Sequence, residues 1–189
     1  MRPGTCKGRR IYIRIRITFM RPVMQGDTMI ILGIDPGFAI TGYGFLNMEG
    51  NKFKVLDYGV ISTNVNQLFS QRLLHIGDEL GMLIEKYRPD AMAIEELFFN
   101  TNTKTAIQAA QGRGVAVYEA SRRHMPVYEF TPLQVKQSIT GYGRADKQQI
   151  QQMVKVLLNL ESIPKPDDAA DALAIAICYG NSAKLAQEC

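Results

Sequence analysis

Three strand-like segments near the start of the chain, followed by alternating helices and strands, restrict the fold more than any other feature of this sequence. The three segments are residues 30–35, 43–47 and 52–61. The breaks between them are short and rich in glycine or asparagine, which favours antiparallel neighbours over crossover connections. The first half of the sheet is therefore predicted to be an antiparallel meander.

The rest of the chain alternates helical and strand patterns. Apolar residues recur at helical spacing between positions 67 and 87, and Arg88-Pro89 ends that helix. The further segments are a buried strand at 90–97, a helix at 103–124, a strand at 126–130 and helices at 146–160 and 168–179. This order predicts an α/β fold with a mixed five-stranded sheet flanked by helices.

The first 28 residues differ in composition from the rest. They hold seven of the 22 basic residues and one of the 18 acidic residues, so positions 29–189 carry 15 basic against 17 acidic side chains. We interpret residues 1–28 as a basic extension that is disordered or not translated, with a DNA-contacting arm as the alternative. Residues 29–182 are predicted to form one domain, and residues 183–189 a short tail. The high pI therefore says little about the domain itself.

Cysteine and histidine are sparse. Cys6, Cys178 and Cys189 lie far apart, and the chain has two histidines. This usage disfavours a zinc site or a disulfide framework and favours a reducing cytoplasm. A catalytic metal would be held by oxygen, which suits Mg²⁺ or Mn²⁺. No apolar run approaches the roughly 20 residues that a membrane helix needs, so we expect a soluble, cytoplasmic protein.

Two acidic residues stand at the ends of predicted strands. Asp35 precedes a Pro-Gly turn, where it is either a ligand or a turn former. Glu95 ends an apolar run, where a charge is costly unless it is paired or bound to a metal; the alternative is that the strand has ended and the acid is solvated. Glu96 follows at once and is expected to face the opposite side of the sheet.

A second pair of acids, Asp168 and Asp171, opens the last predicted helix. A spacing of three places both on one side of the first turn, where they are either ligands or helix-capping acids. Four carboxylates brought together repel one another unless divalent cations neutralise them. A two-metal site of this kind activates water and stabilises the departing oxygen of a phosphodiester. Asp35, Glu95, Asp168 and Asp171 are therefore the candidate catalytic and metal-binding residues.

The motifs around these acids resemble those of the RuvC family of Holliday junction resolvases over residues 29 to about 179. The matching segments are Leu32-Gly33-Ile34-Asp35-Pro36-Gly37, Ala93-Ile94-Glu95 with Phe98, Gln134-Val135-Lys136-Gln137, Gly141-Tyr142-Gly143-Arg144-Ala145-Asp146-Lys147 and Asp168-Ala169-Ala170-Asp171-Ala172-Leu173-Ala174. The resemblance implies a ribonuclease H-like fold. It also implies that the four acids are the metal-binding catalytic residues, with two Mg²⁺ ions per site that Mn²⁺ can replace.

The resemblance further implies a crossover junction endodeoxyribonuclease of DNA recombination and repair. A homodimer would nick two opposing strands of a four-way junction symmetrically, leaving 5′-phosphate and 3′-hydroxyl ends, and would work with a branch-migration helicase complex. Two-fold symmetry suits a substrate with two equivalent strands. Small residues at 106–116, among them Gly112, Gly114 and Ala116, are suited to a dimer interface or to packing on the sheet.

The resemblance also implies several DNA contacts. Lys136 and Lys147 match basic residues near the scissile phosphate, and Arg144 is a further candidate. Residues 104–147 have a local excess of basic side chains, which indicates a phosphate-binding face. Phe98 matches an aromatic residue that stacks on a base at the crossover, and Phe99 is the rival for that role.

Three other interpretations remain open at this point. Actin-like and sugar-kinase ATPases also place an aspartate before glycines in a strand-turn-strand, but they are usually about twice as long. A short relative that processes ribosomal RNA would not explain Phe98 or the segment 141–147. A junction-binding module with structural acids would bind without cutting. The doubled acids Glu95-Glu96 and Asp167-Asp168 leave room for a shift of one residue, although the Asp-Ala-Ala-Asp spacing favours Asp168.

Overall fold

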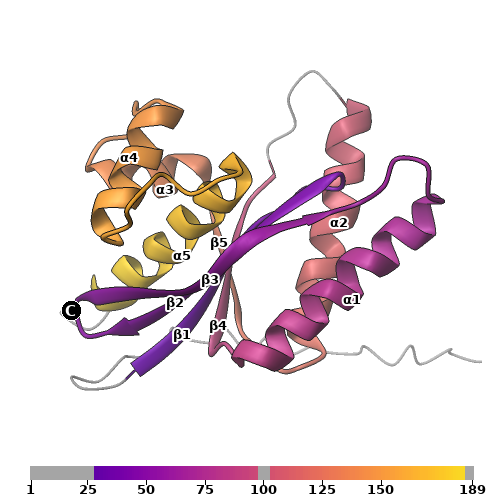
Figure 1. Cartoon of the computed structure of the whole chain (residues 1–189), viewed down its shortest axis with the longest axis horizontal. Helices are drawn as coiled ribbons and strands as arrows, with labels where there is room; N and C mark the ends of the chain where they lie inside the picture. The colour runs from indigo at the N-terminus through magenta and orange to yellow at the C-terminus, as the bar shows by residue number, and fades with distance from the viewer. Residues whose placement is uncertain (1–27, 98–102, 186–189) are drawn as a thin grey trace, which may run out of the picture.

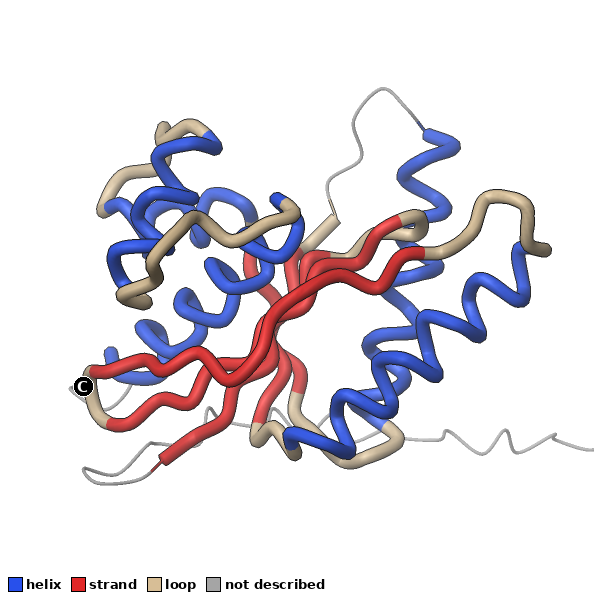
Figure 2. The backbone as a smooth tube through the Cα atoms, in the orientation of Figure 1, coloured by secondary structure: helices blue, strands red, loops and turns tan. Residues whose placement is uncertain are grey.

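The computed structural model describes residues 28–97 and 103–185, which form one mixed sheet between two layers of helices (Figures 1 and 2). The strands are β1 (Thr28–Asp35), β2 (Ile40–Glu49), β3 (Lys52–Ser62), β4 (Ala91–Glu95) and β5 (Val127–Phe130). The helices are α1 (Phe69–Tyr87), α2 (Thr103–Ser121), α3 (Pro132–Thr140), α4 (Lys147–Leu157) and α5 (Asp167–Leu185).

The strand order is β3-β2-β1-β4-β5. Strands β1, β2 and β3 pair antiparallel, as their short connections predicted. Strands β4 and β5 add in parallel, since each follows a helix that crosses back over the sheet. The prediction of a mixed five-stranded sheet flanked by helices is confirmed.

The two faces of the sheet bury separate cores. Helices α1 and α2 cover one face and α3, α4 and α5 the other (Figure 1). Strand alternation sends Leu32 and Ile34 to the α1/α2 face, while Ile31 packs toward α5. Strand β4 divides in the same way, with Met92 and Ile94 on the first face and its remaining residues on the second.

Helix α3 is the one element of the described chain that the sequence pattern did not predict. Its N-terminal signal is present: Thr131 accepts a hydrogen bond from the Gln134 N–H at 3.2 Å, and the Gln134 side chain accepts from the Thr131 N–H at 2.8 Å. Pro132 occupies the first helical turn. This capping box with proline at N1 is a standard start signal, which the apolar spacing of so short a helix did not reinforce.

Close contact between α5 and the sheet depends on glycine. A Cβ on Gly33 would lie 2.1 Å from the Ala172 carbonyl oxygen, and one on Gly42 would lie 2.0 Å from the carbonyl oxygen of Asp168. No real side chain tolerates such distances, so glycine here lets the α5 backbone rest directly on β1 and β2. The first turn of α5 therefore lies over the end of β1.

The small residues of α2 do not share one surface. Gly112 is buried against the backbone of Gly37 and Phe38, and Ala116 is buried in the core, whereas Gly114 is exposed. Gly112 and Ala116 therefore pack within their own chain. Of the two roles considered for the small residues at 106–116, a dimer interface and intramolecular packing, these two residues have the second.

Two further sequence features are placed by the structure. Cys178 is a free, buried cysteine of α5, while Cys6 and Cys189 lie outside the described residues. Among the helices that the structure describes, none is long and apolar enough to cross a membrane.

Candidate active site

Asp35 and Glu95 lie side by side at the carboxyl ends of two adjacent inner strands, β1 and β4. Strands β1 and β4 run parallel, with Ile34 opposite Ile94, and each acid follows directly at the carboxyl end of its strand. Alternation directs both side chains to the α5 face. Glu96 is the next residue, and its N–H donates to the Phe130 carbonyl at 2.9 Å. Glu95 therefore lies on the α5 face with Asp35 and lines the cavity there, whereas Glu96 does not line it.

Asp168 and Asp171 come from the first turn of α5. Across the sheet Asp35 pairs with Gly42, and the Asp168 backbone lies directly over that glycine. The charges of Asp168 and Asp171 both act on Asp35 and raise its pKa. The close approach of α5 to β2 thus brings acids that are more than 130 positions apart in sequence into one electrostatic group.

A cleft of about 300 Å³ opens at this group. It lies between the end of the sheet and helices α3, α4 and α5. Its lining residues are Asp35, Glu95, Pro132, Val135, Lys136, Lys147, Ile150, Asp171, Ala174 and Ile175. Asp168 is not part of this lining. Three of the four candidate acids and two lysines therefore share one cavity, and the remaining residues of its lining are apolar.

Burial changes the titration of the acids. It raises the pKa of Asp35 to about 7, and the charges of Glu95, Asp171 and Asp168 add to the effect. Burial also raises the pKa of Glu95 to about 7, again with help from Asp171, while Lys136 opposes the shift. The pKa of Asp171 is raised by burial as well, against the opposing effect of Lys147. Removing water from a cluster of like charges disfavours the ionised forms, and a cation would restore them.

Lys147 forms an ion pair with one of the candidate acids. Asp146 caps the N-terminus of α4 by accepting from the Gln149 N–H at 2.8 Å, so Lys147 is the first residue of the helix. The Lys147 ammonium lies 3.1 Å from an Asp171 oxygen and 3.6 Å from an Asp167 oxygen. One end of the cleft is thereby partly neutralised, whereas Asp35 and Glu95 make no ion pair within the described chain.

The donors of the cleft suit a hard divalent cation. Carboxylate oxygens are the ligands that Mg²⁺ and Mn²⁺ prefer, and the raised pKa values of Asp35 and Glu95 mark a site that lacks positive charge. Across residues 28–97 and 103–185, no three His, Cys, Asp or Glu side chains are already grouped as a complete metal site. The acids fit such an ion in chemistry and location, and side-chain adjustment would be needed to close around it.

The predicted DNA contacts divide between the cleft and the surface. Lys136 of α3 lines the cleft together with Lys147. Arg144 is exposed in the loop between α3 and α4 and does not line the cleft. Phe98 and Phe99 lie outside the described residues. The structure therefore brings two of the four predicted DNA-binding residues to the acids.

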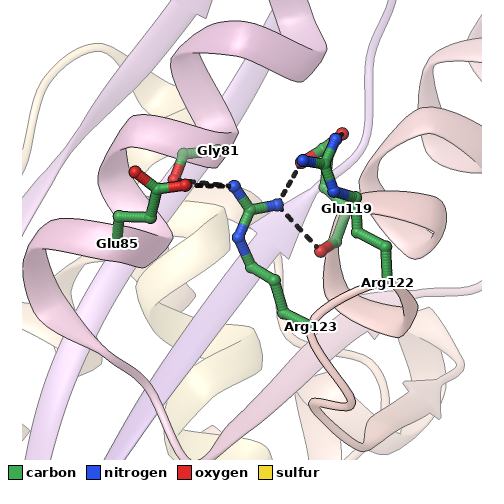
Figure 3. A network of polar contacts seen from close by, with 5 residues as sticks. All are labelled: Gly81, Glu85, Glu119, Arg122 and Arg123. Atoms are coloured by element: carbon green, nitrogen blue, oxygen red, sulfur yellow. Dashed lines mark hydrogen bonds and ion pairs between the residues drawn. The ribbon is translucent and has the colours of Figure 1, made fainter.

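The basic residues at 104–147 do not form the single face that their sequence clustering indicated. On α2 and the turn after it, Arg123 pairs with Glu119 and Glu85 and donates to the Gly81 carbonyl, and Arg122 pairs with Glu119 (Figure 3). This network joins α1 to α2 on the face of the sheet opposite α5. Arg122 and Arg123 therefore lie away from the cleft, with their charges paired to acids of the same chain.

Arg113 belongs to the basic cluster at 104–147, but nothing in the sequence placed it beside Glu95. From α2 it donates through Nε to the carbonyl oxygen of Glu95 at 3.2 Å and pairs with Glu129 of β5 at 2.8 Å. It therefore fixes the backbone at the end of β4, where the Glu95 side chain turns toward the cleft. An arginine in a helix carries no local signal of such a contact, which depends on tertiary packing.

Comparison with known proteins identifies the family. The family model described as crossover junction endodeoxyribonuclease RuvC matches residues 31–179. A crossover junction endodeoxyribonuclease RuvC of Ruminiclostridium cellulolyticum is 63% identical over 157 residues, which are 83% of this chain and 95% of that protein. One of Alkaliphilus metalliredigens is 61% identical over 82% of this chain and 94% of its own length.

A solved structure agrees with the sequence comparisons. The structure of T. thermophilus RuvC in complex with a Holliday junction substrate superimposes with a TM-score of 0.80 at 32% identity, covering 84% of this chain and 97% of that one. The yeast mitochondrial resolvase Ydc2 shares the fold, with a TM-score of 0.62 at 16% identity. The fold and the extent of these matches lead to one conclusion, that this chain belongs to the RuvC family of crossover junction endodeoxyribonucleases.

Proposed function

We propose that this protein resolves four-way DNA junctions by hydrolysing phosphodiester bonds in two opposing strands, leaving 5′-phosphate and 3′-hydroxyl ends. The observation that carries the proposal is the cleft in which Asp35, Glu95 and Asp171 lie with Lys136 and Lys147. Acids that repel one another beside two lysines provide sites for cations and for a phosphate within one cavity. The complex of the T. thermophilus relative with a Holliday junction supports the same substrate.

The four acids would hold the catalytic ions in this proposal. Asp35 and Glu95 supply carboxylates from two adjacent strand ends, and Asp168 and Asp171 supply a pair from one helical turn. Two Mg²⁺ ions, or Mn²⁺ in their place, would activate the attacking water and stabilise the leaving 3′-oxygen. The burial that raises the pKa values of Asp35 and Glu95 also strengthens their attraction for cations.

The remaining residues of the cleft would position the DNA. Lys136 and Lys147 bind the scissile phosphate, since each presents an ammonium group at the cleft and phosphate contacts fix the register of a strand. Exposed Arg144 extends the phosphate contact along the α3–α4 loop. Phe98 stacks on a base of the opened crossover, with Phe99 as the alternative. Arg113 keeps the end of β4 in place, so that Glu95 meets the strand in a fixed position.

A homodimer is part of the proposal. Two equivalent strands of a junction are cut in matched fashion when a two-fold dimer presents one cleft to each. Helix α2 offers Ile107, Gly114 and Tyr118 on its exposed side, and an exposed isoleucine and tyrosine on one helix suit a protein contact. We propose a branch-migration helicase complex as the further partner, because a resolvase acts on junctions that such a complex moves.

Location and domain extent complete the proposal. A cytoplasmic protein with access to the cell's DNA fits the substrate, and the free thiol of Cys178 fits a reducing compartment. We propose residues 29–182 as the core of the nuclease domain and residues 1–28 as an extension that cutting does not need. The predicted tail at 183–189 begins too early, because α5 continues to Leu185 and buries Ala183 in the core.

The test is cleavage of synthetic junctions by the purified protein. A four-way junction labelled on each strand in turn is incubated with Mg²⁺, with Mn²⁺ and with a chelator. We expect paired nicks at symmetric positions, rejoined by DNA ligase, with either metal and none with the chelator. Junction binding without any product under all three conditions would contradict the proposal and identify a binding module instead.

A further inference from the structure

Asp167 lies beside the candidate metal site and is held by side chains that the proposed chemistry does not explain. It is the first residue of α5, one position before Asp168. The Lys165 ammonium donates to one of its oxygens at 2.7 Å, and the Lys147 ammonium lies 3.6 Å from the other. Each oxygen of this carboxylate therefore faces a different lysine.

Two lysines face the Asp167 carboxylate, one at each oxygen. The hydrogen bond from Lys165, the main cause, and the charges of Lys165 and Lys147 lower its pKa. The Gln151 amide lowers it as well, although its buried Nε2 has no hydrogen-bond partner in the described chain. Asp167 thus differs from Asp35 and Glu95, which form no ion pair in the described chain and whose pKa values are raised mainly by burial.

Lys147 is shared between two carboxylates with different proposed roles. Its ammonium is 3.1 Å from Asp171, a candidate metal ligand, and 3.6 Å from Asp167, which does not line the cleft. A lysine bonded to Asp171 alone would neutralise the oxygen that a divalent cation needs. A second anionic acceptor outside the cleft reduces that competition, because one ammonium divides its interaction between both acids.

The geometry points to Asp167 as a positioning residue for Lys147, which keeps the lysine at the edge of the cleft and leaves Asp171 available to a divalent cation. The inference rests on the proposed metal site. Lys165 fixes Asp167 on its other oxygen, so that the acceptor offered to Lys147 stays in place. Once an ion is bound at Asp171, Asp167 remains as the carboxylate partner of Lys147, whose ammonium can then face the phosphate.

The alternative role for Asp167 is purely local. An acid in the first turn of a helix stabilises it through the exposed amides and the dipole, whatever Lys147 does. Its negative charge also attracts any nearby cation over a distance. Both effects act without Lys147, so a double-mutant cycle separates them from the proposed role.

The experiment measures Mn²⁺ binding by isothermal titration calorimetry on the full chain without DNA. We expect Asp167→Asn to weaken Mn²⁺ affinity about fivefold, since Lys147 then bonds Asp171 alone. In a Lys147→Met background the same substitution should change the affinity less than about twofold. Asp78→Asn, which removes an exposed acid from α1 on the other face of the sheet, is the matched control and should leave the affinity unchanged.

The outcomes are distinguishable. An equal loss of affinity with and without Lys147 would overturn the inference and leave a long-range charge effect. Unchanged affinity in Asp167→Asn, with the wild type binding Mn²⁺, would overturn the inference while the proposed site stands. A wild-type protein that binds no Mn²⁺ would overturn both. In cleavage assays, the half-saturating Mg²⁺ concentration of Asp167→Asn should rise by the same factor as its Mn²⁺ dissociation constant.

Discussion

Two groups of buried or partly buried acids lie on opposite faces of the sheet and are balanced in different ways. On the α1/α2 face, the side chain of Glu119 is only 7% exposed and is paired with Arg122 and Arg123 (Figure 3). On the α5 face, Asp35 and Glu95 are partly buried beside further acids, and neither forms an ion pair with a described residue. The first group contains its own counter-charges, whereas in the second Lys147 pairs with Asp171 and leaves Asp35 and Glu95 without a paired cation in the described chain.

The difference separates a structural role from a functional one. Paired charges that join two helices give a fixed contact and need nothing from outside the protein. Unpaired acids destabilise the fold, and a protein retains such a cost where the charge is used for binding or catalysis. The comparison therefore predicts opposite consequences for substitutions in the two groups.

The largest expected effect is on cutting. Asp35→Asn, Glu95→Gln, Asp168→Asn and Asp171→Asn should each lower the rate of junction cleavage by about a thousandfold or more, because each removes a charged ligand from the site. Junction binding, measured by gel shift, should change less than about threefold, since it depends mainly on phosphate contacts. Glu96→Gln is the matched control and should cut normally. A variant that keeps cutting would remove its residue from the site.

The paired group should respond through stability instead. Arg123→Ala leaves the buried Glu119 carboxylate with one exposed partner, and the free energy of unfolding should fall by about 3 kcal/mol in urea denaturation. Arg144→Ala, at an exposed position, should change it by less than about 0.5 kcal/mol. A neutral result for Arg123→Ala would show that the network stabilises nothing and would weaken the contrast between the two groups.

In the metal-free protein, removing an acid of the unpaired group should instead raise the free energy of unfolding. Asp35 has a pKa of about 7 in the folded protein and 3.8 as a free group, so the folded state binds the extra proton between those values. Stability should therefore fall as pH rises from about 4 to 7, and the loss should be complete above pH 7. At pH 8 with a chelator, Asp35→Asn should be more stable than the wild type by about 2 kcal/mol.

Thermal unfolding across this pH range measures the effect. The advantage of Asp35→Asn should vanish near pH 4, where the wild-type carboxyl is protonated, and it should shrink when Mg²⁺ is added. An Asn variant that is less stable than the wild type at pH 8 would mean that Asp35 has a structural partner after all.

A smaller effect is expected from the lysine at the edge of the cleft. Lys147→Ala should weaken junction binding about fivefold and reduce the slope of log affinity against log salt by about one unit, the loss of one phosphate contact. Lys86→Ala, an exposed lysine on the far face, should alter neither quantity. An unchanged slope for Lys147→Ala would count against a phosphate contact at this position.

The smallest effect concerns the N-terminal extension. Removal of residues 1–28 leaves both groups of acids intact, so cutting rates should stay within about twofold of the full chain, and the salt slope should not change. A large loss would show that the basic extension contacts DNA, and it would extend the functional region beyond the cleft.

Much of the fold followed from local pattern. The antiparallel start, the parallel strands and the end of α1 at Arg88 were readable because each has a short-range cause in turn residues, alternation or proline. Helix α3 was not predicted, although Thr131, Pro132 and Gln134 form a helix-start signal. The helix buries only two residues, Val135 and Ile139, so its hydrophobic periodicity is weak. Its omission did not alter the predicted topology.

The sequence predicted some parts of the candidate site and not others. The four acids stood out because each interrupts an apolar or small-residue pattern, and family resemblance connected them. The contacts of Arg113 with Glu95 and of Asp167 with Lys147 could not be predicted from the sequence, because tertiary packing creates them. Sequence clustering also grouped Arg122 and Arg123 with the lysines of the cleft, although both follow the end of α2 on the other face of the sheet and pair with acids there. Charge near the site is predictable from sequence, whereas its pairing is not.

The central claim is tested most directly by a crystal structure of the protein soaked with Mn²⁺, with anomalous diffraction used to locate the ions. The account predicts ions in the cleft at about 2.0 to 2.2 Å from oxygens of Asp35, Glu95, Asp168 and Asp171. A cleft without anomalous signal at millimolar Mn²⁺, with these carboxylates directed away from one another, would contradict it.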